Sequence, residues 1–166
     1  MKTLKYILAM LALATSVAMP QASPTKSEMN DARDSSAAFE AIMVKFRKAQ
    51  VWTPLLDELE HAAKQYVGKS RIQVAMLDVE FPNAPAELKT KAALMSVKLD
   101  DAAAQAIRFT QAYRKVLAVA TSVEPEDDAE HAVAYANQAE TERLKFISAA
   151  KEWAVAALDF AAMAKK

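Results

Sequence analysis

Apolar residues in the second half of the chain recur at alternating intervals of four and three residues. One series runs from Leu88 to Val123, and another runs from Ala132 to Ala164. These intervals keep the side chains on one face of an α-helix and are typical of the contact between paired helices. We therefore expect two helices of about 40 residues that form an antiparallel hairpin about 60 Å long.

The last of these helices carries a second apolar stripe beside the first. Its members are Val133, Leu144, Ile147, Ala154, Leu158 and Ala161. A buried face of this width predicts that the helix also packs against helices from the first half of the chain. We therefore expect an all-α fold, an antiparallel bundle of three to five helices dominated by the long C-terminal hairpin.

Shorter helices are expected in the first half. One is indicated by apolar residues at helical spacing, namely Phe39, Ile42, Met43 and Phe46. Thr53 and Pro54 are typical of a helix start, and Gly68 is typical of a helix end. Residues 70–81 fit either a short helix or a single strand, and we favour the helix because no other segment offers a partner strand.

Residues 23–36 are polar and weakly patterned, so we expect a flexible polar lead before a single folded domain at residues 37–166. Within this lead, Thr25 and Glu28 have the spacing of a capping box, which predicts that a helix begins near Glu28. The length of the chain and its 53% of hydrophobic residues suit one domain with a substantial core.

The N-terminus has the pattern of a secretory signal peptide. Lys2 and Lys5 precede an apolar run at residues 6–14, and small residues follow, which predicts cleavage after Ala22 or Ala18. The apolar run is too short to span a bilayer, and no later segment is suited to span one. We expect residues 1–22 to be removed and the product to be periplasmic or secreted, with no integral membrane segment.

Composition narrows the function classes further. The chain contains one glycine, Gly68, which disfavours folds rich in β-turns, and it contains no cysteine, which excludes thiol chemistry. Its 21 basic and 21 acidic residues balance, and no basic stripe is present. Nucleic-acid binding is therefore not expected.

Both histidines follow an acidic residue at a spacing of three, in Glu58-x-x-His61 and Asp128-x-x-His131. Helical bundles that bind two metal ions use Glu-x-x-His pairs together with further glutamates. His61, however, points away from the apolar face of its helix, so we expect it to be solvated. Metal binding by these four residues is the weaker interpretation, and no cofactor is expected.

Arg143 interrupts the apolar series of the last helix. We expect its aliphatic stem to pack while the guanidinium reaches solvent or pairs with a carboxylate such as Asp100 or Asp101. The alternative is a buried polar residue that fixes the register of two helices.

The sequence shows no hydrolase motif and no phosphate-binding glycine loop. We therefore expect a non-enzymatic protein that acts by protein–protein interaction, such as a chaperone, an inhibitor, an immunity factor or an assembly accessory. Its partner is expected to be another protein, and a homo-oligomer is possible. A bundle that encloses a metal or a non-covalent haem is the alternative.

Overall fold

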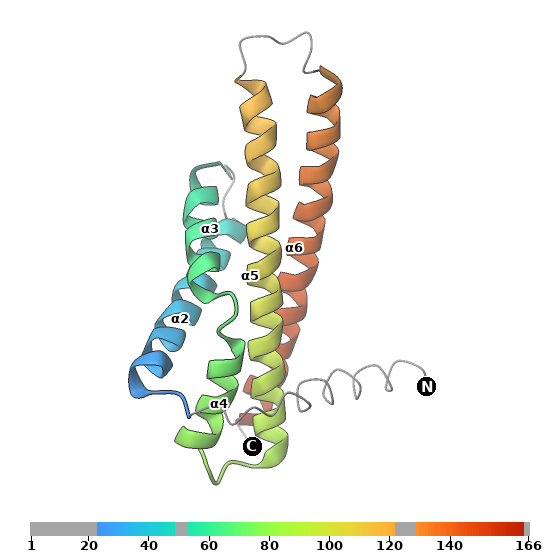
Figure 1. The fold of residues 1–166 in the computed structure, drawn as a ribbon. Coiled ribbons are helices and arrows are strands. Elements are labelled where there is room, and N and C mark those ends of the chain that lie inside the picture. Colours follow the sequence, from blue (N-terminus) through green and yellow to red (C-terminus); the bar gives the residue numbers. More distant parts are fainter. Residues whose placement is uncertain (1–22, 49–52, 122–128, 165–166) are drawn as a thin grey trace, which may run out of the picture.

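Five α-helices make up the part of the chain that the structure describes. The computed structural model describes residues 23–48, 53–121 and 129–164. Its helices are α2 (Lys26–Lys48), α3 (Thr53–Tyr66), α4 (Ser70–Glu80), α5 (Ala86–Ala120) and α6 (Ala129–Ala164) (Figure 1). No strand occurs in these three ranges. The expected all-α bundle is confirmed, and residues 70–80 form a helix.

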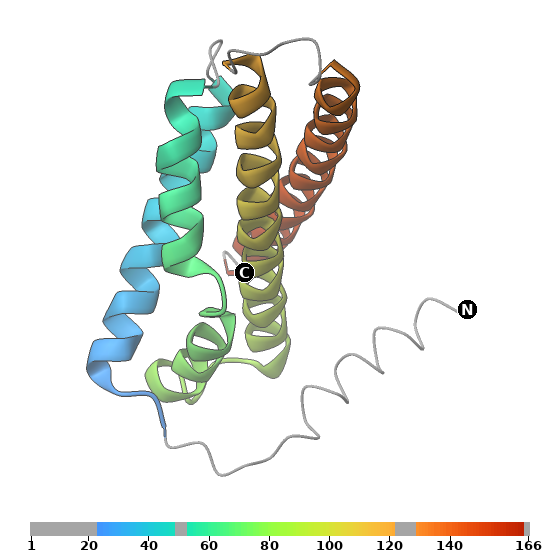
Figure 2. The same ribbon diagram turned by 45° about the horizontal axis from the view of Figure 1, so that its top comes forward.

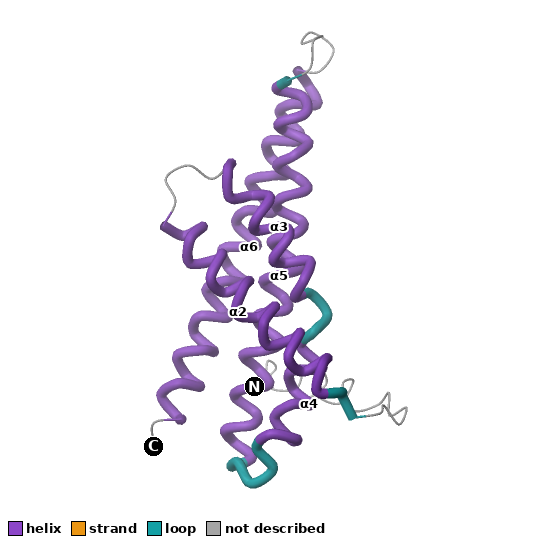
Figure 3. Tube along the Cα trace, turned by 90° about the vertical axis from the view of Figure 1, so that its left-hand side faces the viewer, coloured by secondary structure: helices purple, strands orange, loops and turns teal. Residues whose placement is uncertain are grey.

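The helix α5 lies at the centre of the molecule. It packs against α3 and α4 on one side and against α6 on the other. Figures 1 and 2 show α2, α3 and α4 on the side of α5 that faces away from α6. Figure 3, which looks onto that side, shows these three helices in front of the hairpin, whose free end extends past α3.

The two long helices form the expected antiparallel hairpin, with 35 residues in α5 and 36 in α6. Ion pairs mark their register: Lys91 lies 3.4 Å from Asp159, and Lys98 lies 2.6 Å from Glu152. The two lysines are seven residues apart in α5, and their partners are seven residues apart in α6 in the opposite order, as an antiparallel pair of helices requires. Exposed ion pairs of this kind contribute little stability, so the hairpin depends on its apolar contact.

Small residues of α5 and a group of aromatic rings form the core. Ala102, Ala103 and Ala106 of α5 are all fully buried, and such small side chains let helices approach closely. Beside them, Phe109 of α5 stacks on Phe146 of α6 with ring centroids 6.1 Å apart. Phe46 of α2 meets both of these rings edge-on.

A break at Gly68 separates α3 from α4. Its φ angle of +82° is a left-handed conformation that glycine adopts without strain, as the sequence predicts for a helix end. The carboxylate of Asp100 in α5 accepts hydrogen bonds from the backbone N–H of Gly68 at 2.7 Å and from the Ser70 hydroxyl at 2.6 Å. Asp100 therefore holds the break against the central helix.

Within the polar lead expected at residues 23–36, the chain is helical from Lys26 onward, close to the helix start predicted near Glu28. The predicted capping box forms: the backbone N–H of Thr25 donates to Glu28 at 2.8 Å, and the N–H of Glu28 donates to the Thr25 hydroxyl at 3.2 Å. Met29 and Ala32 are buried and pack with Met76 of α4. The sequence of this segment is mostly polar because only the narrow side of the helix that carries Met29 and Ala32 packs against another helix.

Most of the second apolar stripe of α6 is exposed and only Ile147 and Ala154 are half-buried, which corrects the sequence-based expectation. Val133, Leu144 and Leu158 are exposed, because α2, α3 and α4 cover another face of the α5–α6 hairpin, where Phe46 of α2 reaches Phe146 (Figure 3). The contacts of α6 with the core are made mainly by its first apolar series, through residues such as Phe146 and Trp153, together with Ala149.

The expected signal peptide at residues 1–22, its cleavage site, Val123 and the turn around Pro125 lie outside the described residues. Within the described residues, no helix is both long and apolar enough to cross a membrane.

Candidate functional site

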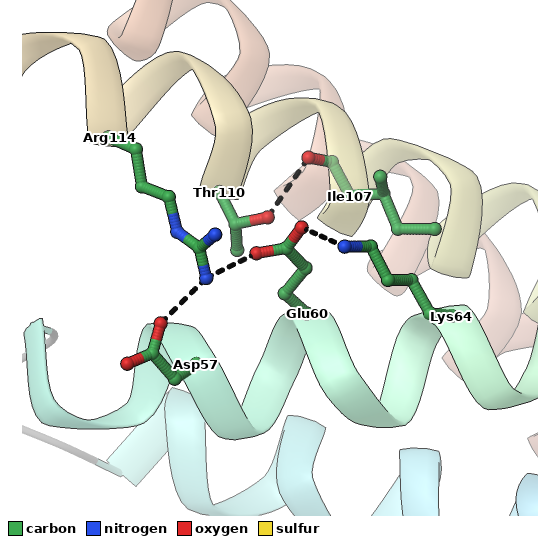
Figure 4. Close-up of polar contacts among 6 residues, drawn as sticks. All are labelled: Asp57, Glu60, Lys64, Ile107, Thr110 and Arg114. Atoms are coloured by element: carbon green, nitrogen blue, oxygen red, sulfur yellow. Dashed lines mark hydrogen bonds and ion pairs between the residues drawn. The ribbon is translucent and has the colours of Figure 1, made fainter.

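A buried carboxylate lies between α3 and α5. Glu60 of α3 is 3% exposed, and its two carboxylate oxygens lie 2.6 Å from Lys64 and 2.6 Å from Arg114. The same Arg114 nitrogen lies 2.7 Å from Asp57 (Figure 4). We call Asp57, Glu60, Lys64 and Arg114 the Glu60 cluster.

The Glu60 cluster has the properties of a structural ion-pair network. A buried carboxylate is tolerated only when cations or hydrogen-bond donors compensate its charge, and here two cations do so. The neighbouring Thr110 is fully buried, but its hydroxyl donates to the carbonyl oxygen of Ile107 in its own helix at 2.9 Å (Figure 4). The cluster therefore fixes α3 on α5, and its groups are engaged with one another.

A second polar network joins α2, α3, α4 and α5 around Tyr66. The buried Tyr66 hydroxyl donates to the side chain of Gln73 at 2.8 Å, and Gln73 in turn donates to the backbone oxygen of Ala32 at 3.1 Å. Burial, followed by the nearby charges of Asp100 and Glu40, raises the pKa of Tyr66. The phenol is thus held in its protonated, hydrogen-bond-donating form.

The structure does not bring the four candidate metal ligands together. Glu58 and His61 lie on the exposed surface of α3, where Glu58 is 3.7 Å from Lys45. His131 is exposed on α6, on the other side of α5, beside the ring of Tyr135. Asp128 lies outside the described residues. Across the described ranges, no group of three or more His, Asp or Glu side chains could hold a metal ion.

Arg143 pairs within its own helix rather than with Asp100 or Asp101. Its guanidinium donates to both carboxylate oxygens of Glu140, at 2.7 and 2.6 Å. This bond is the main cause that lowers the pKa of Glu140. The expected pairing with a carboxylate therefore occurs, with a partner one turn away in the same helix that is available whatever the tertiary structure.

The Arg143–Glu140 pair borders an open depression of about 410 Å³ between α5 and α6. Its other lining residues are mainly apolar: Phe109, Tyr113, Val116, Ala136 and Ala139. The volume is at the small end of the range for small-molecule pockets. Its charged groups already pair with each other, so the depression presents mainly an apolar surface to a ligand.

The most unusual surface is the side of α6 that points away from α5. We call it the outer face of α6 and define it by four large apolar residues: Val133, Leu144, Val155 and Leu158. Their exposed fractions are 63%, 54%, 60% and 71%. Sequence reasoning identified three of these residues but assigned them to the core, and it missed Val155.

Comparisons with known proteins give no match among family models, curated proteins or solved structures.

We predict that Arg114→Met destabilises the protein by about 2 kcal/mol, because it removes a cation from the buried Glu60 while keeping an apolar stem. The double variant Glu60→Leu/Arg114→Met is expected to recover most of this loss. Denaturant unfolding measures both effects. Arg108→Met, at an exposed arginine of the same helix, is the control and should change stability by less than about 0.5 kcal/mol. If Arg108→Met lowered the stability as much as Arg114→Met does, the stabilising role of the Glu60 cluster would be contradicted.

A second prediction concerns Glu40, whose pKa is raised by burial and only partly lowered again by the hydrogen bond from Ser36. A raised pKa means that the ionised form is less favourable in the folded chain than in the unfolded chain. Glu40→Gln should therefore stabilise the protein at pH 7, and this gain should disappear below about pH 4, where Glu40 is protonated in both states. Unfolding curves across pH check this, and a gain independent of pH would refute it.

Proposed function

We propose that the chain is an exported, non-enzymatic helical-bundle protein that acts by binding another protein. Chaperones, inhibitors, immunity factors and assembly accessories all work in this way. The observation that carries the proposal is the outer face of α6, where four large apolar side chains are more than half exposed.

Physical chemistry supports an interaction role for this face. Each large apolar side chain that is left in water forgoes about 1.5–3 kcal/mol of burial free energy. Single exposed apolar residues are common on protein surfaces, but an aligned series along one helix is typical of a surface that a partner covers. Because α6 has its only extensive contact with α5, a partner can reach its outer face without rearranging the bundle.

The proposed location rests on the N-terminal sequence. Lys2, Lys5 and the apolar run at residues 6–14 are typical of a signal peptide, so we propose that the processed chain acts in the periplasm or outside the cell. A chain without cysteine folds there independently of disulfide formation.

A photoreactive amino acid placed at Leu158 in the native cell tests this proposal. Leu158 is the most exposed of the four apolar side chains that define the outer face, and we expect irradiation to yield a specific cross-linked adduct with a protein partner. Val79 of α4, which is 51% exposed on the other side of the molecule, is the matched control. No adduct at Leu158, or equal adducts at both positions, would refute the proposal.

A further inference from the structure

The apolar residues of the outer face are arranged along a nearly straight line. Val133, Leu144 and Val155 are spaced by eleven residues, and eleven residues complete about three helical turns with a drift of only about 20°. From Val133 to Leu158 the line is about 37 Å long at the standard rise per residue. A straight helix can therefore lie against all four apolar residues at once.

Two opposite charges lie on this line, on either side of Leu144 and Ser148. Glu140 is toward the N-terminus of α6, and its side chain remains 54% exposed although Arg143 pairs with it. Lys151 is toward the C-terminus, is exposed, and makes no ion pair with any residue that the structure describes. A carboxylate accepts several hydrogen bonds, so Glu140 can bind a second cation beside Arg143.

We propose that the outer face of α6 binds the same face of a second copy of this chain, antiparallel, across a two-fold axis between residues 145 and 146. In this register Glu140 faces Lys151 of the second copy, and the two-fold axis repeats the pair. Val133 then faces Leu158 of the second copy. The inference rests on the proposed function, because it specifies which protein binds the outer face of α6, namely a second copy of this chain.

Charge favours the antiparallel dimer over the parallel one. A parallel arrangement in register would place Glu140 against Glu140 and Lys151 against Lys151, and like charges in contact are unfavourable. A two-fold interface requires a patch that is complementary to itself, and one acid and one base at equal distances from the axis meet this requirement. A single pair of helices buries an area at the low end for specific interfaces, so the dimer should be concentration-dependent.

Charge exchange combined with molar-mass measurement tests the arrangement. The processed full chain is examined by sedimentation equilibrium from about 1 μM to about 1 mM. We expect a monomer–dimer equilibrium in which Glu140→Lys or Lys151→Glu each weakens dimerisation by about 10-fold or more. The double variant Glu140→Lys/Lys151→Glu should restore it. Glu58→Lys on the exposed side of α3 is the control and should leave it unchanged, and circular dichroism verifies that every variant remains helical.

Thiol cross-linking tests the register independently, because the chain has no cysteine of its own. In the antiparallel register the two copies of Ser148→Cys are offset along the helix by about 7.5 Å, whereas the two copies of Val133→Cys are offset by about 37 Å. A short bis-maleimide should therefore cross-link Ser148→Cys with itself and leave Val133→Cys uncoupled. A mixture of Val133→Cys and Leu158→Cys should form the mixed dimer. Cross-linking of Val133→Cys to itself would overturn the antiparallel arrangement.

A chain that stays monomeric up to about 1 mM would also overturn the inference. The proposed function is decided separately by the adduct at Leu158 in the cell. An adduct with a different protein, together with a monomeric chain, would leave the proposed function standing and eliminate the self-association. The absence of both adduct and dimer would eliminate both.

Discussion

The packing of α5 against neighbours on both of its sides is the constraint on which the rest of the structure depends. A helix covered on two sides needs apolar residues toward both of its neighbours, and bulky residues there would keep these neighbours apart. Ala102, Ala103 and Ala106, all fully buried, meet this requirement with the smallest side chains available. Because three helices occupy one side of α5, α6 has a single extensive neighbour, and its outer face is left to solvent.

Polar contacts then determine where the short helices lie along α5. The alanine-rich surface offers little that distinguishes one axial position from the next, whereas ion pairs and hydrogen bonds have specific geometry. The Glu60 cluster connects α3 to α5, and Asp100 connects the break at Gly68 to the same helix. Both contacts are made to α5. They therefore fix the positions of α3 and of the break at Gly68 along the central helix, on the side of the molecule opposite to α6.

The helices themselves could be predicted from the sequence, because apolar spacing and the residues Thr25, Glu28 and Gly68 report local geometry. Periodicity shows which side of a helix is apolar but not what covers it, and the sequence therefore wrongly predicts that Val133, Leu144 and Leu158 are buried. For the same reason, the burial of Glu60 was not predicted from the sequence. The available signal was its helical spacing from Leu56 and Ala63, which are both buried. The metal-ligand interpretation of His61 and His131 likewise depended on a proximity that spacing alone does not determine.

The uncovered outer face of α6 is tested most directly by thiol labelling along this helix in dilute solution, where self-association is negligible. Single cysteines are introduced one at a time from residue 144 to residue 158 into a chain that has none. The account predicts rapid modification at 144, 148, 151, 155 and 158 and slow modification at 146 and 156, where the native Phe146 and Ala156 are buried. Slow modification at 144, 155 and 158, equal to that at 146, would contradict it.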